Sequence, residues 1–157
     1  MKEKRKKEIQ LSRKSSKIMI IDDEERLLIA IKKYLVTKQF TIILCNSAKE
    51  ALYKLENEKV DLLIIDILMS DMSGYDLVRS LRNDPTISHI PFIFLTAKGM
   101  TEDRITGYKM GCKAYLGKPF DPEELVAIID NILSDRKNIT NIISIKTEIQ
   151  NLRKKNN

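Results

Sequence analysis

The chain has 157 residues, of which 43% are hydrophobic and 32% are charged, and its formal net charge is +6. This length suits one compact domain with tails. No apolar run approaches the ~20 residues that a membrane helix needs, and no apolar segment follows the N-terminal charges, so we expect neither a membrane span nor a secretory signal. The two cysteines have no paired spacing, which argues against a zinc site and favours a reducing compartment.

The positive charge lies at the two ends of the chain. Residues 1–17 hold eight Lys or Arg and two Glu, residues 135–157 hold six Lys or Arg and two acids, and residues 18–134 hold fourteen basic and eighteen acidic residues. We therefore expect a disordered basic arm over 1–17, with a nucleic-acid-binding arm as the alternative. The many Lys, Asn and Ile residues are typical of an AT-rich genome, such as that of a plastid, an endosymbiont or a low-GC bacterium. We expect a cytoplasmic protein, with the plastid stroma as a second location.

The first half of the chain alternates apolar strands with helical patterns. The run 18–21 is entirely apolar and predicts a buried strand, and apolar residues at helical spacing predict a helix over about 24–38. Residues 40–45 predict the second strand. Ser47, with Glu50 three residues later, matches a capping box and predicts the start of the second helix. Residues 60–65 predict the third strand, because its apolar residues do not alternate with polar ones.

The second half of the chain repeats this alternation. Gly74 opens a third helix, which ends before Pro85 because the residue before a proline avoids the helical region. Residues 91–96 predict the fourth strand, 101–110 predict a short helix ended by Gly111, and 114–117 predict a brief fifth strand. Asp121 as the cap and Pro122 as the first helical residue predict a fifth helix, whose apolar stripe continues to about residue 133.

Five strands thus alternate with five helices through short connections. This order is the signature of an α/β fold with a doubly wound parallel sheet. We expect the folded domain to span residues 18–134. Residues 135–157 predict a basic C-terminal helix or linker, because about 20 residues cannot form a core alone.

Polar residues follow four of the predicted strands. Asp22 and Asp23 end the first strand, Asp66 ends the third, Thr96 ends the fourth, and Lys118 follows the fifth. A doubly wound sheet brings the carboxyl ends of its strands to one edge, where ligands bind. Three carboxylates in one pocket repel each other, so we expect a cation among them, and hard oxygen ligands suit Mg²⁺.

Lys118 and Thr96, the other two residues at this edge of the sheet, indicate which kind of ligand binds there. Lys118 adds a positive charge and Thr96 adds a hydroxyl donor, which together suit a phosphoryl group. The carboxylate of Asp66 can then act as a nucleophile and form an acyl phosphate. Taken alone, Asp66 fits a solvated carboxylate at a strand end, but five such residues in order favour the functional interpretation.

With these five residues and the five-fold alternation, the chain resembles a response-regulator receiver domain of two-component signalling over about residues 17–133. The resemblance implies the flavodoxin-like fold of the bacterial chemotaxis regulator, with strand order 2-1-3-4-5. It also implies that Asp66 is the phosphoacceptor and a Mg²⁺ ligand, that Asp23 binds Mg²⁺ directly, and that Asp22 acts mostly through water.

The resemblance implies roles for further positions. The backbone carbonyl of Leu68 would be a metal ligand, Thr96 the switch hydroxyl and Tyr115 the switch aromatic residue. Lys118 would contact the phosphate and would be joined to the following proline by a cis peptide bond. Gly74 matches the glycine that begins the third helix of the family.

Two features depart from the family pattern. Ser70 stands where the family often has proline, so we expect a looser loop, with an added negative charge at Asp71. Leu68 and Lys98 stand at positions that influence how fast family members lose their phosphate. An apolar residue and a lysine there could lengthen or shorten the lifetime of the phosphorylated form, and the sequence does not decide between the two.

The resemblance implies a response regulator, not an enzyme with turnover. A histidine kinase or phosphotransfer protein would be its partner. Phosphorylation would change the face formed by the helix over 101–110, the strand over 114–117 and the helix after Asp121. Regulation of transcription is the expected output, and we keep open a homodimer through that face and contact with DNA. The alternatives are a stand-alone receiver that acts only through protein partners and a Mg²⁺-dependent aspartyl phosphatase. Leu68 argues against the phosphatase, because that class has a second aspartate at this position.

Overall fold

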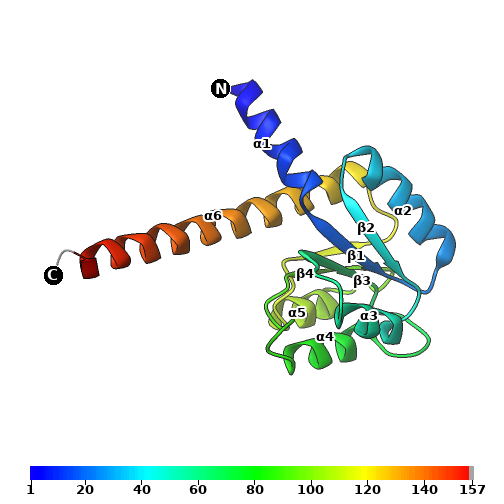
Figure 1. Ribbon diagram of the computed structural model, residues 1–157. Coiled ribbons are helices and arrows are strands. Elements are labelled where there is room, and N and C mark those ends of the chain that lie inside the picture. The colour runs from blue at the N-terminus through cyan, green and yellow to red at the C-terminus, as the bar shows by residue number, and fades with distance from the viewer. Residues whose placement is uncertain (156–157) are drawn as a thin grey trace.

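Five parallel strands form one sheet in the order β2-β1-β3-β4-β5, the order that the family resemblance implies. Figure 1 shows the computed structural model, which describes residues 1–155. The two central strands β1 and β3 pair in register from Ile18 with Leu62 to Ile21 with Ile65. The strands span Lys17–Ile21 (β1), Thr41–Cys45 (β2), Leu62–Ile65 (β3), Phe92–Thr96 (β4) and Ala114–Gly117 (β5).

Helices cover both faces of this sheet and leave the strand ends free. The core on one face joins the sheet to α3 and α4, and the core on the other face joins it to α2 and the first turns of α6. All residues of β3 and β4 are buried, as expected of strands that lie between two helical layers. The helices span Lys2–Lys14 (α1), Glu25–Thr37 (α2), Ala48–Leu55 (α3), Gly74–Arg82 (α4), Thr101–Lys109 (α5) and Pro122–Lys155 (α6).

Local sequence signals fix several of the helix ends. The Ser47 hydroxyl accepts a hydrogen bond from the backbone N–H of Glu50 at the start of α3, and the Glu50 carboxylate accepts one from the N–H of Asn46. Gly111 follows α5 with a φ of +89°, a left-handed conformation that favours glycine at a helix end. These contacts confirm the predicted cap of α3 and the predicted end of α5.

The N-terminal segment differs from the disordered arm expected over 1–17. Lys2–Lys14 form helix α1, which adds a sixth helix to the five predicted. Lys, Arg, Glu and Gln are good helix formers, and a tertiary contact anchors the last turn. There the guanidinium of Arg13 donates two hydrogen bonds to the Asp130 carboxylate on α6, at 2.5 and 3.0 Å, and lies over the ring of Phe40.

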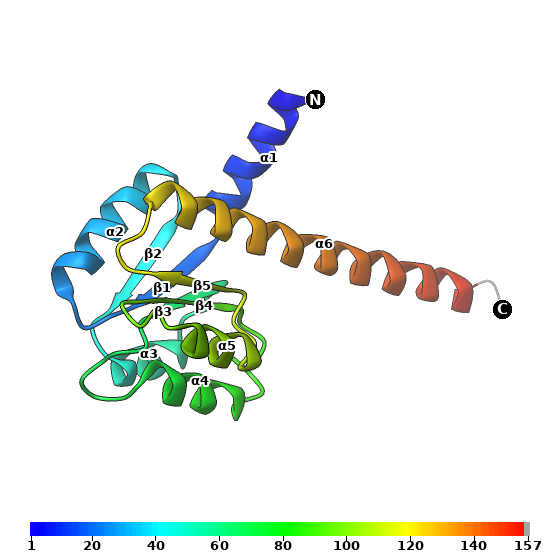
Figure 2. The same cartoon turned by 180° about the vertical axis from the view of Figure 1, so that it is seen from behind.

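The C-terminal segment continues the last helix of the receiver without a break. Of the two predicted forms, helix or linker, the structure has a helix that continues from the core to Lys155. Figure 2 shows its second half extending well beyond the sheet, away from α1. Among the described residues, no helix is both long enough and apolar enough to cross a membrane.

Candidate functional site

The parallel register brings two acidic strand ends side by side. Asp22 follows β1 and Asp66 follows β3, and the backbone N–H of Asp66 donates to the carbonyl of Ile21 at 2.9 Å. Both carboxylates are nearly buried, with exposed fractions of 2% for Asp22 and 5% for Asp66. The apolar strands hold these two side chains in place at the edge of the sheet.

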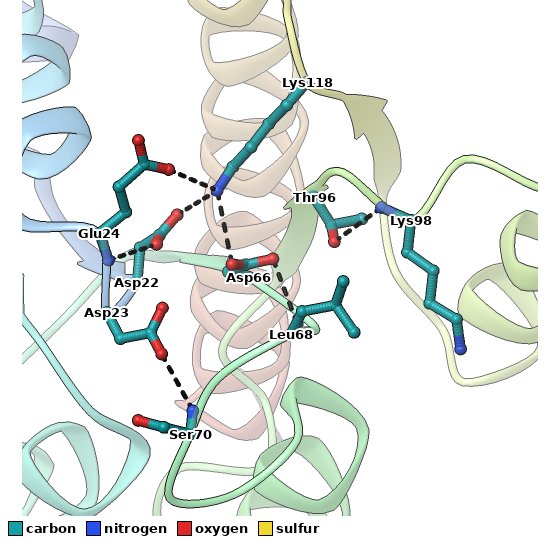
Figure 3. A network of polar contacts seen from close by, with 9 residues as sticks. All are labelled: Asp22, Asp23, Glu24, Asp66, Leu68, Ser70, Thr96, Lys98 and Lys118. Carbon is teal, nitrogen blue, oxygen red and sulfur yellow. Dashed lines mark hydrogen bonds and ion pairs between the residues drawn. The ribbon is translucent and has the colours of Figure 1, made fainter.

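Three carboxylates meet at this edge. One carboxylate oxygen from each of Asp22, Asp23 and Asp66 lies within 4.8 Å of the other two, and Asp23 is the exposed member of the group (Figure 3). Oxygen ligands from so few side chains fit Mg²⁺, which keeps several waters and binds one or two carboxylates. The three carboxylates predicted from the sequence as metal ligands are therefore close enough to share one ion.

Lys118 reaches this acidic group from the loop after β5. Its ammonium lies 2.6 Å from the Asp22 carboxylate, 3.4 Å from that of Asp66 and 3.9 Å from that of Glu24. Burial raises the pKa of Asp22, and the hydrogen bond from Lys118 opposes that rise. Burial tends to lower the pKa of Lys118, but the neighbouring carboxylates raise it above its usual range. The ammonium is therefore a fixed positive charge between two carboxylates.

Backbone N–H groups also orient the three carboxylates. The N–H of Glu24 donates to Asp22 at 2.9 Å, and the N–H of Leu68 donates to Asp66 at 3.3 Å. The N–H of Ser70 donates to Asp23 at 3.0 Å, so the loop after β3 is tied to the end of β1. The side chain of Leu68 is 55% exposed and is open to solvent beside the acceptor.

Gly74 allows α4 to start directly against the end of β3, beside Asp66. A Cβ at this position would lie 2.4 Å from the carbonyl oxygen of Asp66 and 2.8 Å from the Cα of Ile67. Both atoms belong to the backbone, so no rotation of a side chain makes room for it. The glycine that the sequence places at this helix start is therefore needed for the position of Asp66.

From the sequence we expect Asp71 to add a negative charge near the acidic group, but its side chain turns elsewhere. Its carboxylate instead accepts hydrogen bonds from the N–H groups of Lys49 at 3.0 Å and Ala48 at 3.3 Å, at the start of α3. Although burial raises its pKa, these backbone donors hold the pKa of Asp71 below its usual range. The loop that carries Ser70 is therefore anchored at Asp71, where we had expected it to be loose.

Thr96 and Tyr115 lie on the other side of Asp66. The buried hydroxyl of Thr96 accepts a hydrogen bond from the N–H of Lys98 at 3.2 Å. The hydroxyl of Tyr115 donates to the backbone carbonyl of Lys98, so one short loop contacts both predicted switch residues. The side chain of Lys98 points away from the carboxylates and forms an ion pair with Asp103 at 3.0 Å (Figure 3).

The ring of Tyr115 is turned inward and is only 8% exposed. It lies 6.0 Å from the ring of Phe94, edge to face, over Gly107 of α5. A Cβ on Gly107 would lie 2.8 Å from the Tyr115 ring, so the absence of a side chain makes room for the inward ring. The sequence identified Tyr115 through the family resemblance alone, and nothing in it indicated the contribution of Gly107.

The remaining expectations have mixed outcomes. The bond between Lys118 and Pro119 is a cis peptide, as expected. The parts played by Asp22, Asp23, Asp66, Thr96 and Lys118 in phosphoryl transfer, and by the carbonyl of Leu68 in metal binding, stay predictions. Sequence reasoning missed the contacts of Asp71 with α3 and of Gly107 with Tyr115, because both depend on the folded path of the chain.

Comparisons with known proteins agree with this geometry. Residues 18–130 match the response regulator receiver domain family. The probable transcriptional regulator ycf29 of Pyropia yezoensis is 46% identical over 120 residues, which cover 76% of this chain and 54% of that protein. The response regulator Rre1 of Synechocystis sp. is 37% identical over 136 residues, which cover 86% of this chain and 59% of that protein. The chain therefore spans little more than half the length of these relatives.

Solved structures show the same fold. A CheY-like receiver domain protein from Methanospirillum hungatei has a TM-score of 0.72 and 27% identity, covering 78% of this chain and 97% of that one. The receiver domain of the Francisella response regulator 1452 has a TM-score of 0.71 and 32% identity, covering 78% of this chain and 99% of that one. The chain therefore belongs to the response-regulator receiver domain family.

Proposed function

We propose that this protein is a phosphorylation-dependent signalling switch, in which Asp66 accepts a phosphoryl group from a phosphohistidine on a histidine kinase or phosphotransfer protein. One observation supports this most directly. Carboxylate oxygens of Asp22, Asp23 and Asp66 come within 4.8 Å of one another, and the ammonium of Lys118 contacts two of the three groups. This arrangement suits transfer of a phosphoryl group to one buried carboxylate.

The transfer is a displacement at phosphorus. An Asp66 carboxylate oxygen forms the new P–O bond while the P–N bond of the phosphohistidine breaks, and the released imidazole takes a proton from solvent. Asp22, Asp23, Asp66 and the carbonyl of Leu68 would hold Mg²⁺, which when bound would neutralise charge at the phosphoryl oxygens. Lys118 supplies a second, fixed positive charge, and the N–H of Leu68 orients the attacking carboxylate.

Phosphorylation then changes a neighbouring surface. The phosphoryl group on Asp66 carries close to two negative charges, which attract the Thr96 hydroxyl. In the structure that hydroxyl accepts from the N–H of Lys98, whose carbonyl in turn accepts from Tyr115. A shift of Thr96 toward the phosphate therefore alters the loop that holds Tyr115. The face formed by α5, β5 and the first turns of α6 is the surface that this change reaches, and it is our candidate for homodimer formation and partner binding.

The donor protein has a docking place beside the site. A hollow of about 560 Å³ lies between α2 and the loop after β5, next to Lys118. Its lining is mostly apolar, with Leu27, Ile31, Tyr34 and Phe120 among its side chains. An apolar helix of the donor fits such a groove and would bring a histidine close to Asp66.

We propose regulation of transcription as the output, because several relatives carry names of transcriptional or response regulators. A receiver that acts only through protein partners is the alternative. DNA is a second candidate partner, because the basic residues at both ends of the chain would attract its phosphates. We place the protein in the cytoplasm or the plastid stroma, and the relatives from Pyropia yezoensis and Cyanophora paradoxa favour the plastid.

The Mg²⁺-dependent phosphatase is less well supported. The position two residues after Asp66 is Leu68, which has no carboxylate to act as a general acid or base. Family membership also favours a signalling protein, since receiver domains generally act as switches. Steady release of phosphate from small phosphate esters would be the result that favours the enzyme.

Labelling with acetyl phosphate tests the proposed function. The wild-type chain should gain one acid-stable, hydroxylamine-sensitive phosphoryl group in the presence of Mg²⁺, and none in EDTA. Asp66→Asn should abolish the label, whereas Ser70→Ala, in the same loop, should keep it. Label that persists in Asp66→Asn would show that another residue is the acceptor, and the proposal would then fail.

A further inference from the structure

The second half of α6 carries apolar side chains that no other part of residues 1–155 covers. In the first turns of the helix, Leu125, Ile129 and Leu133 are buried in the receiver core. Beyond the receiver, six large apolar side chains of α6 are exposed. Four of them, which are 53%, 57%, 44% and 57% exposed, form what we call the α6 stripe: Ile142, Ile145, Ile149 and Leu152. The other two are Ile139 and Ile143. Figures 1 and 2 show no other element beside this half of the helix.

The α6 stripe has the spacing of a coiled-coil seam. Its residues follow one another by three, four and three positions, which places them at the a and d positions of two heptads. The opposite side of the helix holds Ser144, Thr147 and Asn151, with the exposed Ile143 beside them. A helix with one continuous apolar seam and a mostly polar back is suited to pairing with another helix.

The stripe faces away from the receiver. Ile145 follows Ile129 by sixteen residues, which turns it by about 160° around the helix from the buried side. A helix that approaches the stripe therefore does not meet the sheet. Helix α1 contacts α6 closer to the receiver, and the hollow between these two helices extends only as far as Asn141. The seam is therefore free from Ile142 onward.

We propose that the α6 stripe binds the same stripe of a second copy of this chain, in a parallel two-stranded coiled coil. The flanking charges specify this partner and its direction. In a parallel pair, Glu148 lies beside Arg153 of the second copy, which is an attractive pair at the edge of the seam. An antiparallel pair over the same residues would bring Lys146 beside Lys146 of the second copy, and Glu148 beside Glu148 of the second copy. Both contacts join like charges and disfavour that direction. Isoleucine at both a positions with leucine at the d position Leu152 favours two strands, whereas isoleucine at the other d position, Ile145, favours three or more.

This dimer differs from the one proposed through the face of α5, β5 and the first turns of α6. It uses residues beyond the receiver, and it does not require Asp66 to be phosphorylated. Two heptads form a short seam, so the association is weak and reversible. Its effect is to hold two receivers on opposite sides of one helical stem.

Sedimentation equilibrium of the unphosphorylated full chain over a wide range of concentrations tests this inference. The wild type should show a reversible equilibrium between monomer and dimer. Ile145→Glu with Ile149→Glu should weaken association at least about tenfold, because carboxylates would enter the seam. The matched variant Ser144→Glu with Thr147→Glu makes the same charge change on the polar side and should associate like the wild type. A monomer at every concentration, a trimer, or a dimer that Ile145→Glu with Ile149→Glu leaves unchanged would overturn the proposal.

Disulfide formation tests the direction of the pair. In a parallel coil, Leu152→Cys brings two thiols together, and oxidised glutathione should link the chains. The wild type is the control, because its own Cys45 and Cys112 are buried. Linkage only in the double variant Ile142→Cys with Leu152→Cys, and not in Leu152→Cys alone, would show an antiparallel pair and contradict the proposal. Circular dichroism of each variant checks that α6 remains helical.

Discussion

Replacing Gly74 by alanine tests how closely α4 must approach Asp66, the proposed phosphoacceptor. The added Cβ would lie 2.4 Å from the carbonyl oxygen of Asp66, whereas ordinary contacts begin at 3.4 Å, so the backbone must separate by about 1 Å. Because both neighbouring atoms are backbone, the strain cannot be relieved by a rotamer change. Overpacking of a core typically costs ~1–3 kcal/mol, and we expect the upper part of that range, about 2–3 kcal/mol.

Two assays measure the effect of Gly74→Ala. Urea denaturation should give the expected loss of unfolding free energy, and acetyl phosphate labelling should slow by up to about 10²-fold, because a 1 Å displacement of a reacting group has that effect. Gly117→Ala is the matched control, since a Cβ there meets nothing within 4 Å, and its stability should change by less than about 0.5 kcal/mol. If Gly74→Ala unfolds and labels like the wild type, the argument from close approach is refuted.

Three further substitutions test contacts around the site and at the N-terminal helix. Gly107→Ala should push the Tyr115 ring outward, because the new methyl group would lie 2.8 Å from it, and the nuclear Overhauser effect between Phe94 and Tyr115 should disappear; an unchanged effect would contradict this. Asp71→Ala should lower the unfolding free energy by about 0.5–2 kcal/mol, since α3 loses an acceptor for two N–H groups, and a urea midpoint equal to the wild type would refute that contact. Arg13→Met should release α1 from α6 and speed amide exchange over Lys2–Lys14 by roughly tenfold, equivalent to about 1.4 kcal/mol, with no change in the strands. Exchange in α1 that stays at the wild-type rate would show that Arg13 does not hold the helix.

The sheet and the acidic site follow from patterns that are local in the sequence. Unbroken apolar runs identify the buried strands, and Asp22, Asp66 and Thr96 each stand where such a run ends. Once the strands are parallel, the topology alone places these residues at one edge. The same topology places Lys118 at this edge, and the family resemblance added only its expected contact with the phosphate.

Contacts between distant segments could not be predicted in this way. The composition of residues 1–17 indicated a disordered arm. The Arg13–Asp130 pair, which orders the end of this segment, joins residues 117 positions apart and leaves no trace in the local sequence. Asp71 looked like an added charge near the acceptor, but the path of its loop turns it toward Lys49. The direction of a loop side chain depends on packing, which a sequence pattern of a few residues does not specify.

Binding of Mg²⁺ to the unphosphorylated chain tests the central claim most directly. Titration calorimetry should show one Mg²⁺ site in the wild type and in Ser70→Ala. Asp23→Asn and Asp66→Asn should each weaken it at least tenfold, since one of the three converging carboxylates loses its charge. Equal affinity in wild type and in both aspartate variants, with each variant folded, would show that the three carboxylates do not share an ion.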